Sequence, residues 1–193
     1  MVSTAARLAL ARADYSPSEV PPEVLAFLSS PRVTGKADVL RAALRGEHSP
    51  ELLALLPRAL HDECERTRIV AAGALCRRSE NLREVADCVL AALSSTDDHN
   101  VMLACHVAGE LRQQADVLTP ALERLVRERP GRARGNALTA LRELGHDPEA
   151  LLRLCELCDQ DAEPLVRFVV SQVRKAWPSA GKATPSRAAT PAP

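Results

Sequence analysis

The hydrophobic residues in segment 134–145 recur with the spacing of one face of an α-helix. Leu138, Leu141 and Leu144 lie three residues apart, so their side chains form a single stripe on a helix. Gly145 follows directly, where helices commonly end in a left-handed residue. Because a helix with one apolar stripe has to bury it against neighbours, the segment predicts one unit of a packed helical structure.

Comparable segments recur along the chain from residue 31 onward, separated by short breaks rich in Ser, Gly, Pro and Asp. No segment alternates with a period of two, so no strand is predicted. The helices are expected in antiparallel pairs. The first helices are predicted at 34–45, 64–78, 98–113, 131–144 and 163–177, and the second ones at 50–61, 81–93, 117–127 and 148–159.

The first helices align on a common register. With Arg134 as the reference, the equivalent residues are Lys36, Arg68, Ala104 and Arg167, separated by 32, 36, 30 and 33 residues. Small or apolar residues follow three and four positions later in almost every segment. This steady offset indicates a repeat in which each unit packs only on its neighbours.

An acidic residue precedes the reference position by six residues in four of the five units. An acid near a helix start favours the helix dipole and can pair with a basic residue of the same or the adjacent unit. We therefore predict a ladder of ion pairs along the stack, in which an exposed pair contributes only about 0.2–1 kcal/mol. The residues at this position are Ser30, Asp62, Asp98, Glu128 and Asp161.

These units resemble HEAT repeats, or the HEAT-like repeats related to those of phycobilin lyases. Segments 62–75 and 128–145 carry the acid, the basic residue and the small apolar pair most completely. The pattern is weaker at Ala104, and at Ser171 and Arg174 we expect a terminal capping unit with a polar outer face. The resemblance implies an all-α fold, a right-handed α-solenoid of about five HEAT-like helical hairpins, and it specifies no activity.

Three regions are predicted. Residues 1–30 form an N-terminal helical cap, with one helix at about 3–14 and a short second helix that ends at Leu28. Residues 31–177 form the solenoid. Residues 178–193 are rich in Pro, Ala, Ser and Thr and are predicted to form a disordered tail. The alternative is that the Thr-Pro sequences of this tail are modification or docking sites. An acid-free N-terminus also fits an organelle transit peptide, although we favour the capping helix and a cytoplasmic protein.

Composition supports an all-α fold and argues against some partners. Among 193 residues, 46% are hydrophobic but only two are Phe, one Tyr and one Trp, so the core is expected to consist of Leu, Val and Ala. Lys+Arg and Asp+Glu both number 25, which argues against binding nucleic acid or an anionic membrane. The apolar runs are too short for a membrane span.

The cysteines and histidines raise three chemical alternatives, none of which we favour. Cys155 and Cys158 form a single C-x-x-C motif on a predicted buried stripe, so we interpret them as core residues. A zinc site with His61 and Cys64 is excluded by the expected distance between their repeats. Cys105 precedes a histidine, but adjacent helix residues point about 100° apart and do not form a nucleophile–base pair. We predict no catalytic residue, cofactor or metal.

Charged residues on the second helices are the predicted contact surface, because second helices usually line the concave side of such solenoids. This surface is free of aromatic residues, which predicts a polar contact of modest affinity. Residues 124–142 carry six arginines and one glutamate, whereas 147–163 carry six acids and one arginine. The candidate partner-binding residues are Arg58, Arg83, Asp87, Glu123, Arg124, Arg127 and Arg153.

The leading hypothesis is a non-enzymatic interaction or scaffold module that holds a protein or peptide on its concave face. The alternative is an enzyme, either an accessory chromophore lyase or a HEAT-like DNA glycosylase; the latter requires a basic groove with aromatic residues. A third hypothesis is self-association through exposed end repeats. The sequence leaves the partner's identity and the oligomeric state open.

Overall fold

The computed structural model describes residues 20–30, 35–44 and 49–177 of the 193-residue chain. Within these residues every regular element is a helix, which confirms the all-α prediction. The predicted helix at 3–14 and the predicted tail at 178–193 lie outside the described residues. None of the helices in the described residues is long and apolar enough to cross a membrane.

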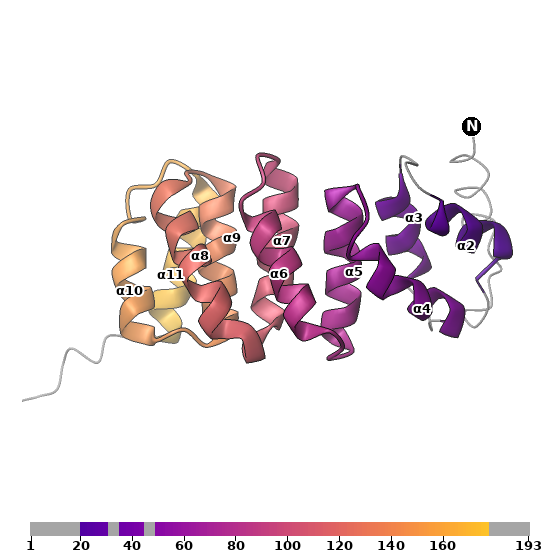
Figure 1. Cartoon of the computed structure of the whole chain (residues 1–193). Helices are drawn as coiled ribbons and strands as arrows, with labels where there is room; N and C mark the ends of the chain where they lie inside the picture. The colour runs from indigo at the N-terminus through magenta and orange to yellow at the C-terminus, as the bar shows by residue number, and fades with distance from the viewer. Residues whose placement is uncertain (1–19, 31–34, 45–48, 178–193) are drawn as a thin grey trace, which may run out of the picture.

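The helices form two rows that run along one axis, with α2 (Pro22–Ser29) at one end (Figure 1). The first row consists of α3 (Lys36–Ala43), α5 (Glu65–Arg77), α7 (Asp98–Glu110), α9 (Arg132–Leu144) and α11 (Pro164–Ala176). The second row consists of α4 (Pro50–Ala59), α6 (Leu82–Leu93), α8 (Ala115–Glu128) and α10 (Pro148–Glu156). A 3-10 turn, η1 (Arg112–Gln114), precedes α8.

Every helix predicted within the described residues is present, with ends that differ by a few residues. The largest differences are three residues, at the predicted helices 98–113 and 148–159. There α7 ends at Glu110, where the chain turns through η1, and α10 ends at Glu156. Local signals account for several boundaries: the side chains of Ser49 and Asp147 cap α4 and α10, accepting hydrogen bonds from Leu52 N and Ala150 N. Gly145 ends α9 in the left-handed region, with φ of 81°.

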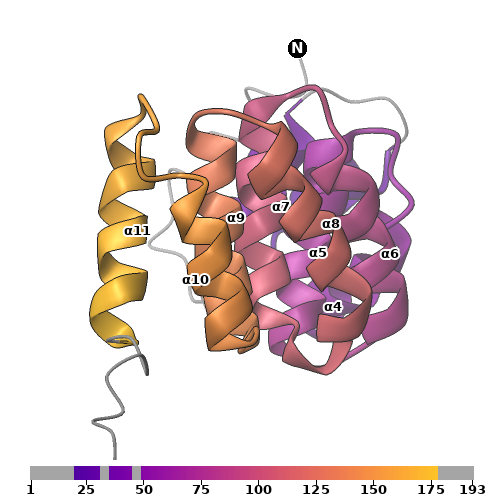
Figure 2. The same cartoon turned by 90° about the vertical axis from the view of Figure 1, so that its left-hand side faces the viewer.

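The two rows do not pack equally closely. Each first-row helix contacts the next along the whole row, and the second-row helices α6, α8 and α10 also contact in sequence, but α4 and α6 make few contacts. Figure 2 shows the two rows from the end of the stack. The closer first row favours a stack that curves toward α3, α5, α7 and α9.

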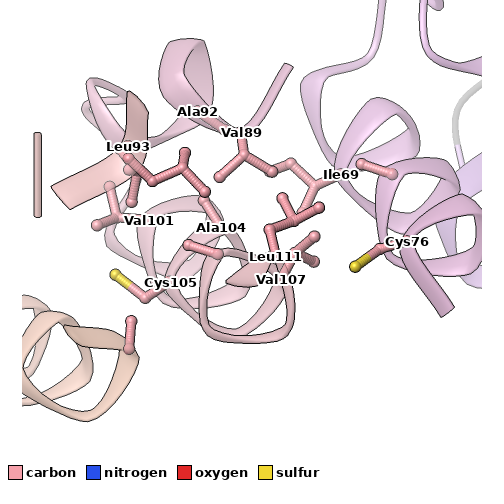
Figure 3. Packing of buried hydrophobic residues seen from close by; sticks show 14 of the residues in the cluster. Ile69, Cys76, Val89, Ala92, Leu93, Val101, Ala104, Cys105, Val107 and Leu111 are labelled. Carbon is pink, nitrogen blue, oxygen red and sulfur yellow. The ribbon is translucent and has the colours of Figure 1, made fainter. Parts of the chain in front are cut away.

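Small side chains permit the close approach of the first-row helices. Ala71 and Ala72 of α5, Ala104 and Ala108 of α7, and Ala137 of α9 are fully buried. Figure 3 labels buried side chains of α5, α6 and α7, together with Leu111, and all of them belong to one hydrophobic cluster. The core is therefore built from aliphatic residues shared between neighbouring units, as the composition predicts.

A glycine in α9 provides a test of this packing. A Cβ on Gly135 would lie 3.5 Å from Val166 Cγ2 and 3.6 Å from Leu165 Cγ, which is ordinary contact. We expect Gly135→Ala to raise the free energy of unfolding by about 0.5–1 kcal/mol in urea titrations, because alanine loses less backbone entropy. Gly145→Ala is the matched control and should destabilise by about 1 kcal/mol. Destabilisation by Gly135→Ala would mean that α9 and α11 pack more tightly than described.

Buried ion pairs confirm two steps of the predicted ladder. Lys36 Nζ lies 2.5 Å from Asp62 Oδ2, and Arg134 pairs with Asp161 in the same way. In each case the basic residue belongs to one unit and the acid to the next. Each acid also accepts a hydrogen bond from the backbone two residues later. Both pairs are mostly buried between the helices, so the small contribution expected of an exposed pair does not apply to them.

The two middle junctions depart from the predicted ladder. Glu65 Oε2 accepts hydrogen bonds from Ser95 Oγ at 2.7 Å and from Asn100 Nδ2 at 2.6 Å. Arg129 Nη2 lies 3.1 Å from Asp98 Oδ1, and its Nη1 donates to the Ser95 carbonyl at 2.6 Å. At the first of these junctions the reference residue Arg68 donates instead to the backbone carbonyls of Asp62 and Glu63. At the second junction the reference residue is Ala104, which has no side-chain donor.

Glu128 does not fill the ladder position that the register assigns to it. It is the last residue of α8, four residues before α9 begins, and its side chain is exposed. The prediction that an acid starts each first helix is therefore wrong at this unit. The turn between α8 and α9, residues 129–131, is the shortest that leads into a first-row helix, so the position six residues before Arg134 falls inside the preceding helix.

Candidate functional site

The cysteines of the sequence motifs at 155–158 and 105–106 lie in the core, whereas the histidine that follows Cys105 lies on the surface. Cys155 and Cys158 are buried, and Cys158 Sγ donates a hydrogen bond to the Leu154 carbonyl at 3.3 Å, which confirms their interpretation as core residues. Cys105 is buried whereas the His106 side chain is 70% exposed, so the two point apart as predicted. In the part of the chain that the structure describes, no three His, Cys, Asp or Glu residues group as metal ligands.

Burial makes most of the thiols poor nucleophiles. It raises the pKa of Cys105 to about 12 and the pKa values of Cys88 and Cys155 to about 11, and it also raises those of Cys76 and Cys158. A thiol whose pKa is raised in the folded state remains protonated, and unreactive, at neutral pH. Cys64, which precedes α5, is exposed.

We expect one rapidly reacting thiol per native chain. A thiol-disulfide reagent at pH 8 should modify Cys64 quickly, and the remaining five cysteines only after denaturation, since unfolding restores ordinary pKa values. Absorbance of the released thiolate gives the stoichiometry, and Cys64→Ser should remove the fast phase. A second fast equivalent in the native protein would contradict the burial described here.

The seven predicted contact residues lie on four different second-row helices. Arg58 is on α4, Arg83 and Asp87 are on α6, and Arg153 is on α10, where it lies 3.9 Å from Glu149. All of these are exposed. Among the described residues, no ion pair links any of the seven to another of them on a different helix.

Three of the seven residues are neighbours on α8. Arg127 Nη2 donates to Glu123 Oε2 at 2.8 Å, and His146 Nε2 lies 3.2 Å from Glu123 Oε1 without hydrogen-bond geometry. Arg124 is exposed and borders a shallow hollow with Arg129. The structure therefore brings together Glu123, Arg124 and Arg127, with one of the arginines already paired within the helix.

Arg58 borders a separate cavity at the N-terminal end of the stack. This cavity of about 250 Å³ lies among α2, α3, α4 and the start of α5, next to the Lys36–Asp62 pair. The Thr67 hydroxyl on its wall is buried and has no hydrogen-bond partner. Arg58 is thus remote from the α8 residues and does not share a surface with them.

The first row contains hollows that the sequence did not indicate. One of about 250 Å³ lies across α3, α5 and α7, and a second of about 320 Å³ lies between α7 and α9. A third, more open, of about 460 Å³ borders the ends of α5 and α7. His106 lines all three, so the hollows join into one surface. We call this surface the first-row groove; its main lining residues are Arg41, Leu44, Val70, Arg77, Met102, Leu103 and His106.

Arginines flank the apolar floor of the first-row groove. Arg41 from α3 lies at one side, and its Nη2 atom is buried without a hydrogen-bond partner among the described residues. Arg77 from α5 is 56% exposed and lies 3.9 Å from Glu110 Oε2, a loose pair. Sequence reasoning missed both, because it assigned the contact surface to the second helices.

Comparison with known proteins adds no family to this description. Neither the protein-family models nor the curated protein sequences contain a match to this chain. The class of the protein is therefore argued from the helical architecture and the groove.

Proposed function

We propose that the chain is a HEAT-like α-solenoid that acts as a non-enzymatic interaction module for a protein or peptide partner. The predicted hairpins join each first-row helix to the second-row helix that follows it. Because α3 makes few contacts with α4, and α7 few with α8, we pair each second-row helix with the following first-row helix instead. The pairs α2–α3, α4–α5, α6–α7, α8–α9 and α10–α11 then account for all the described α-helices as five hairpins. In this pairing the buried acid of two junctions precedes the second helix of its hairpin, and the basic residue before it belongs to the previous hairpin. The recurrence of this linkage at two of the four junctions supports a repeat protein.

The first-row groove is the observation that carries the proposed function. It is continuous across α3, α5, α7 and α9, and its floor is largely apolar. The closer packing of this row supports an inner, concave position for the groove, where solenoids bind extended partners. Concave apolar surfaces with a few polar groups at the rim are typical binding sites.

The proposal is tested with a display library of random 12-residue peptides selected against the immobilised full-length chain. Enriched peptides should shift the NMR methyl signals of Leu44, Val70 and Leu103. Val117, an exposed second-row residue, is the control and should not shift. If no peptide is enriched, the proposal of a peptide-binding module fails.

The same peptides test the second-row site. If Arg124, Arg127 and Glu123 form the contact surface, the double variant Arg124→Ala/Arg127→Ala should weaken peptide binding while leaving the unfolding midpoint unchanged. If the peptide occupies the first-row groove, this variant should bind like the wild type. One titration therefore decides whether the peptide binds at the α8 residues or in the first-row groove.

Self-association through the last helix is a second candidate function. On α11, Leu165 is 36% exposed and Phe168 is 59% exposed, although the register predicts a polar outer face for a capping unit. Phe168 occupies the register position of Gly135, the α9 residue whose added Cβ would contact Val166. Phe168 thus lies where a further unit would pack, and a second copy can bury it in a symmetric contact.

Sedimentation equilibrium at several concentrations measures this association. We expect a monomer–dimer equilibrium for the wild-type chain and a monomer for Phe168→Glu, because a charge at the centre of an apolar contact prevents burial. Val117→Glu, an equivalent change on an exposed apolar residue of α8, is the matched control. A wild-type chain that is monomeric at all concentrations contradicts this function.

A further inference from the structure

We propose that the first-row groove binds a peptide segment in which an acidic side chain lies next to large apolar side chains, with Arg41 receiving the carboxylate. This inference rests on the proposed function and defines its ligand class. It is carried by the position of Arg41, the shape of the hollow beside it and the distribution of charge along the groove.

Arg41 has an unsatisfied donor at the edge of the hollow. Its Nη2 atom is buried and has no hydrogen-bond partner among the described residues. Nearly all buried polar groups in proteins are paired, because an unpaired buried donor has lost its water without compensation. A ligand cannot reach a buried atom, so the carboxylate binds only when the Arg41 guanidinium turns toward the hollow, where it matches an acidic side chain in geometry and charge.

The floor beside Arg41 is suited to apolar side chains. Leu44, Ile69, Val70 and Leu103 line it, and the volume of about 250 Å³ accommodates a leucine or phenylalanine side chain. Gly73 keeps this space open, since a Cβ there would lie 3.2 Å from Val107 Cγ2 and 3.6 Å from Arg77 Nη1. The ligand must therefore combine an acid with a bulky hydrophobic residue.

Charge along the groove sets the position of the acid. Arg41 and Arg77 border the hollow between α3, α5 and α7, and no acidic residue of the described ranges lines it. The open hollow at the ends of α5 and α7 is balanced, with Arg77 and Arg112 beside Glu110 and Glu143, and the hollow between α7 and α9 is lined by Glu143. The Arg77–Glu110 distance of 3.9 Å leaves Arg77 available for a second acceptor. An acidic residue is therefore attracted to the α3–α5 end and repelled from the α9 end.

The extent of the groove favours a peptide over a small molecule. The three hollows, of about 250, 320 and 460 Å³, meet at His106 and extend over four helices. One small ligand fills a single hollow, whereas an extended or helical segment places successive side chains in several of them. We therefore assign the groove to a segment of another protein.

The experiment uses peptides enriched from the 12-residue display library against the full-length chain. We expect enrichment of Asp or Glu beside Leu, Ile, Met or Phe. Isothermal titration then compares each peptide and its Glu→Gln or Asp→Asn form on the wild type, on Arg41→Met and on the control Arg132→Met. Arg132 is an exposed arginine of α9 that lines none of the three hollows. Methionine retains the apolar stem of arginine and removes the charge.

Arg41→Met is expected to weaken binding of the acidic peptide about tenfold or more, as for a lost charge-assisted hydrogen bond. The amide form of the peptide should bind the wild type with the same reduced affinity and should be insensitive to Arg41→Met. Arg132→Met should leave both affinities unchanged. Gly73→Ala, which fills the hollow, should weaken both peptide forms.

Three results would overturn the inference. Enrichment of peptides without acidic residues, or equal binding of the acidic peptide to the wild type and Arg41→Met, removes the role of Arg41 while the interaction module stands. Failure to enrich any peptide overturns the module and the inference together. Thermal unfolding of Arg41→Met serves as the folding check, and removal of an unsatisfied donor predicts an unchanged or higher midpoint.

Discussion

Replacement of Leu141 by alanine is expected to lower the free energy of unfolding by about 2–5 kcal/mol. Leu141 is fully buried in α9, the first-row helix that contacts both α7 and α11. Removing its side chain leaves a cavity between units. The neighbouring helices cannot close this cavity by shifting, because each unit shares its core with the next. Urea unfolding monitored by circular dichroism at 222 nm measures the change.

Leu157→Ala is the matched control for this prediction. Leu157 follows α10 and is 63% exposed, so the same truncation should change the free energy of unfolding by less than about 0.5 kcal/mol. A loss below about 1 kcal/mol for Leu141→Ala would show that the register of the first helices is incorrect.

Replacement of Asp161 by asparagine is expected to cost about 3 kcal/mol, because it leaves the Arg134 guanidinium partly buried without its counter-charge. The side chains of Asp161 and Arg134 are only 5% and 18% exposed. Asp161 Oδ1 also accepts a hydrogen bond from Glu163 N at 2.9 Å, immediately before α11. The last hairpin should therefore loosen first, and hydrogen exchange of α11 amides should accelerate more than that of α5 amides.

The pair formed by Asp159 and Arg174 provides the control. Its side chains are 38% and 45% exposed, although its shortest distance is 2.7 Å. Solvent screens an exposed pair, so Asp159→Asn should cost less than about 1 kcal/mol in the same urea titration. Equal losses for Asp161→Asn and Asp159→Asn would contradict the prediction that burial makes the Arg134–Asp161 pair contribute more to stability than the exposed pair.

Much of the fold was predictable because helix formation depends on local pattern. The stripe of Leu138, Leu141 and Leu144 and the termination at Gly145 reappear in α9 with the predicted bounds nearly unchanged. The spacing of Lys36, Asp62, Arg134 and Asp161 also anticipated two ion pairs, although not their burial. These features repeat at a fixed offset, so they can be recognised without knowing how the units pack.

The candidate site was less predictable, because a groove depends on how the helices pack. Nothing in the sequence around Arg41 or His106 distinguishes them from other polar residues on helix surfaces. Their significance arises where α3, α5 and α7 meet and leave a hollow that Gly73 keeps open. The small residues of the first helices, such as Ala71 and Ala104, are the one signal from which the closer row could have been inferred.

The sequence by itself determined the all-α class, the positions of the helices and the aliphatic composition of the core, since each follows from periodicity and propensity within a few turns of the chain. Only the tertiary structure decided which row packs more closely, which ion pairs are buried and where hollows remain. These properties depend on side chains that are distant in the sequence, such as Arg41 and Leu103, and on volumes left between helices. No local pattern encodes such volumes.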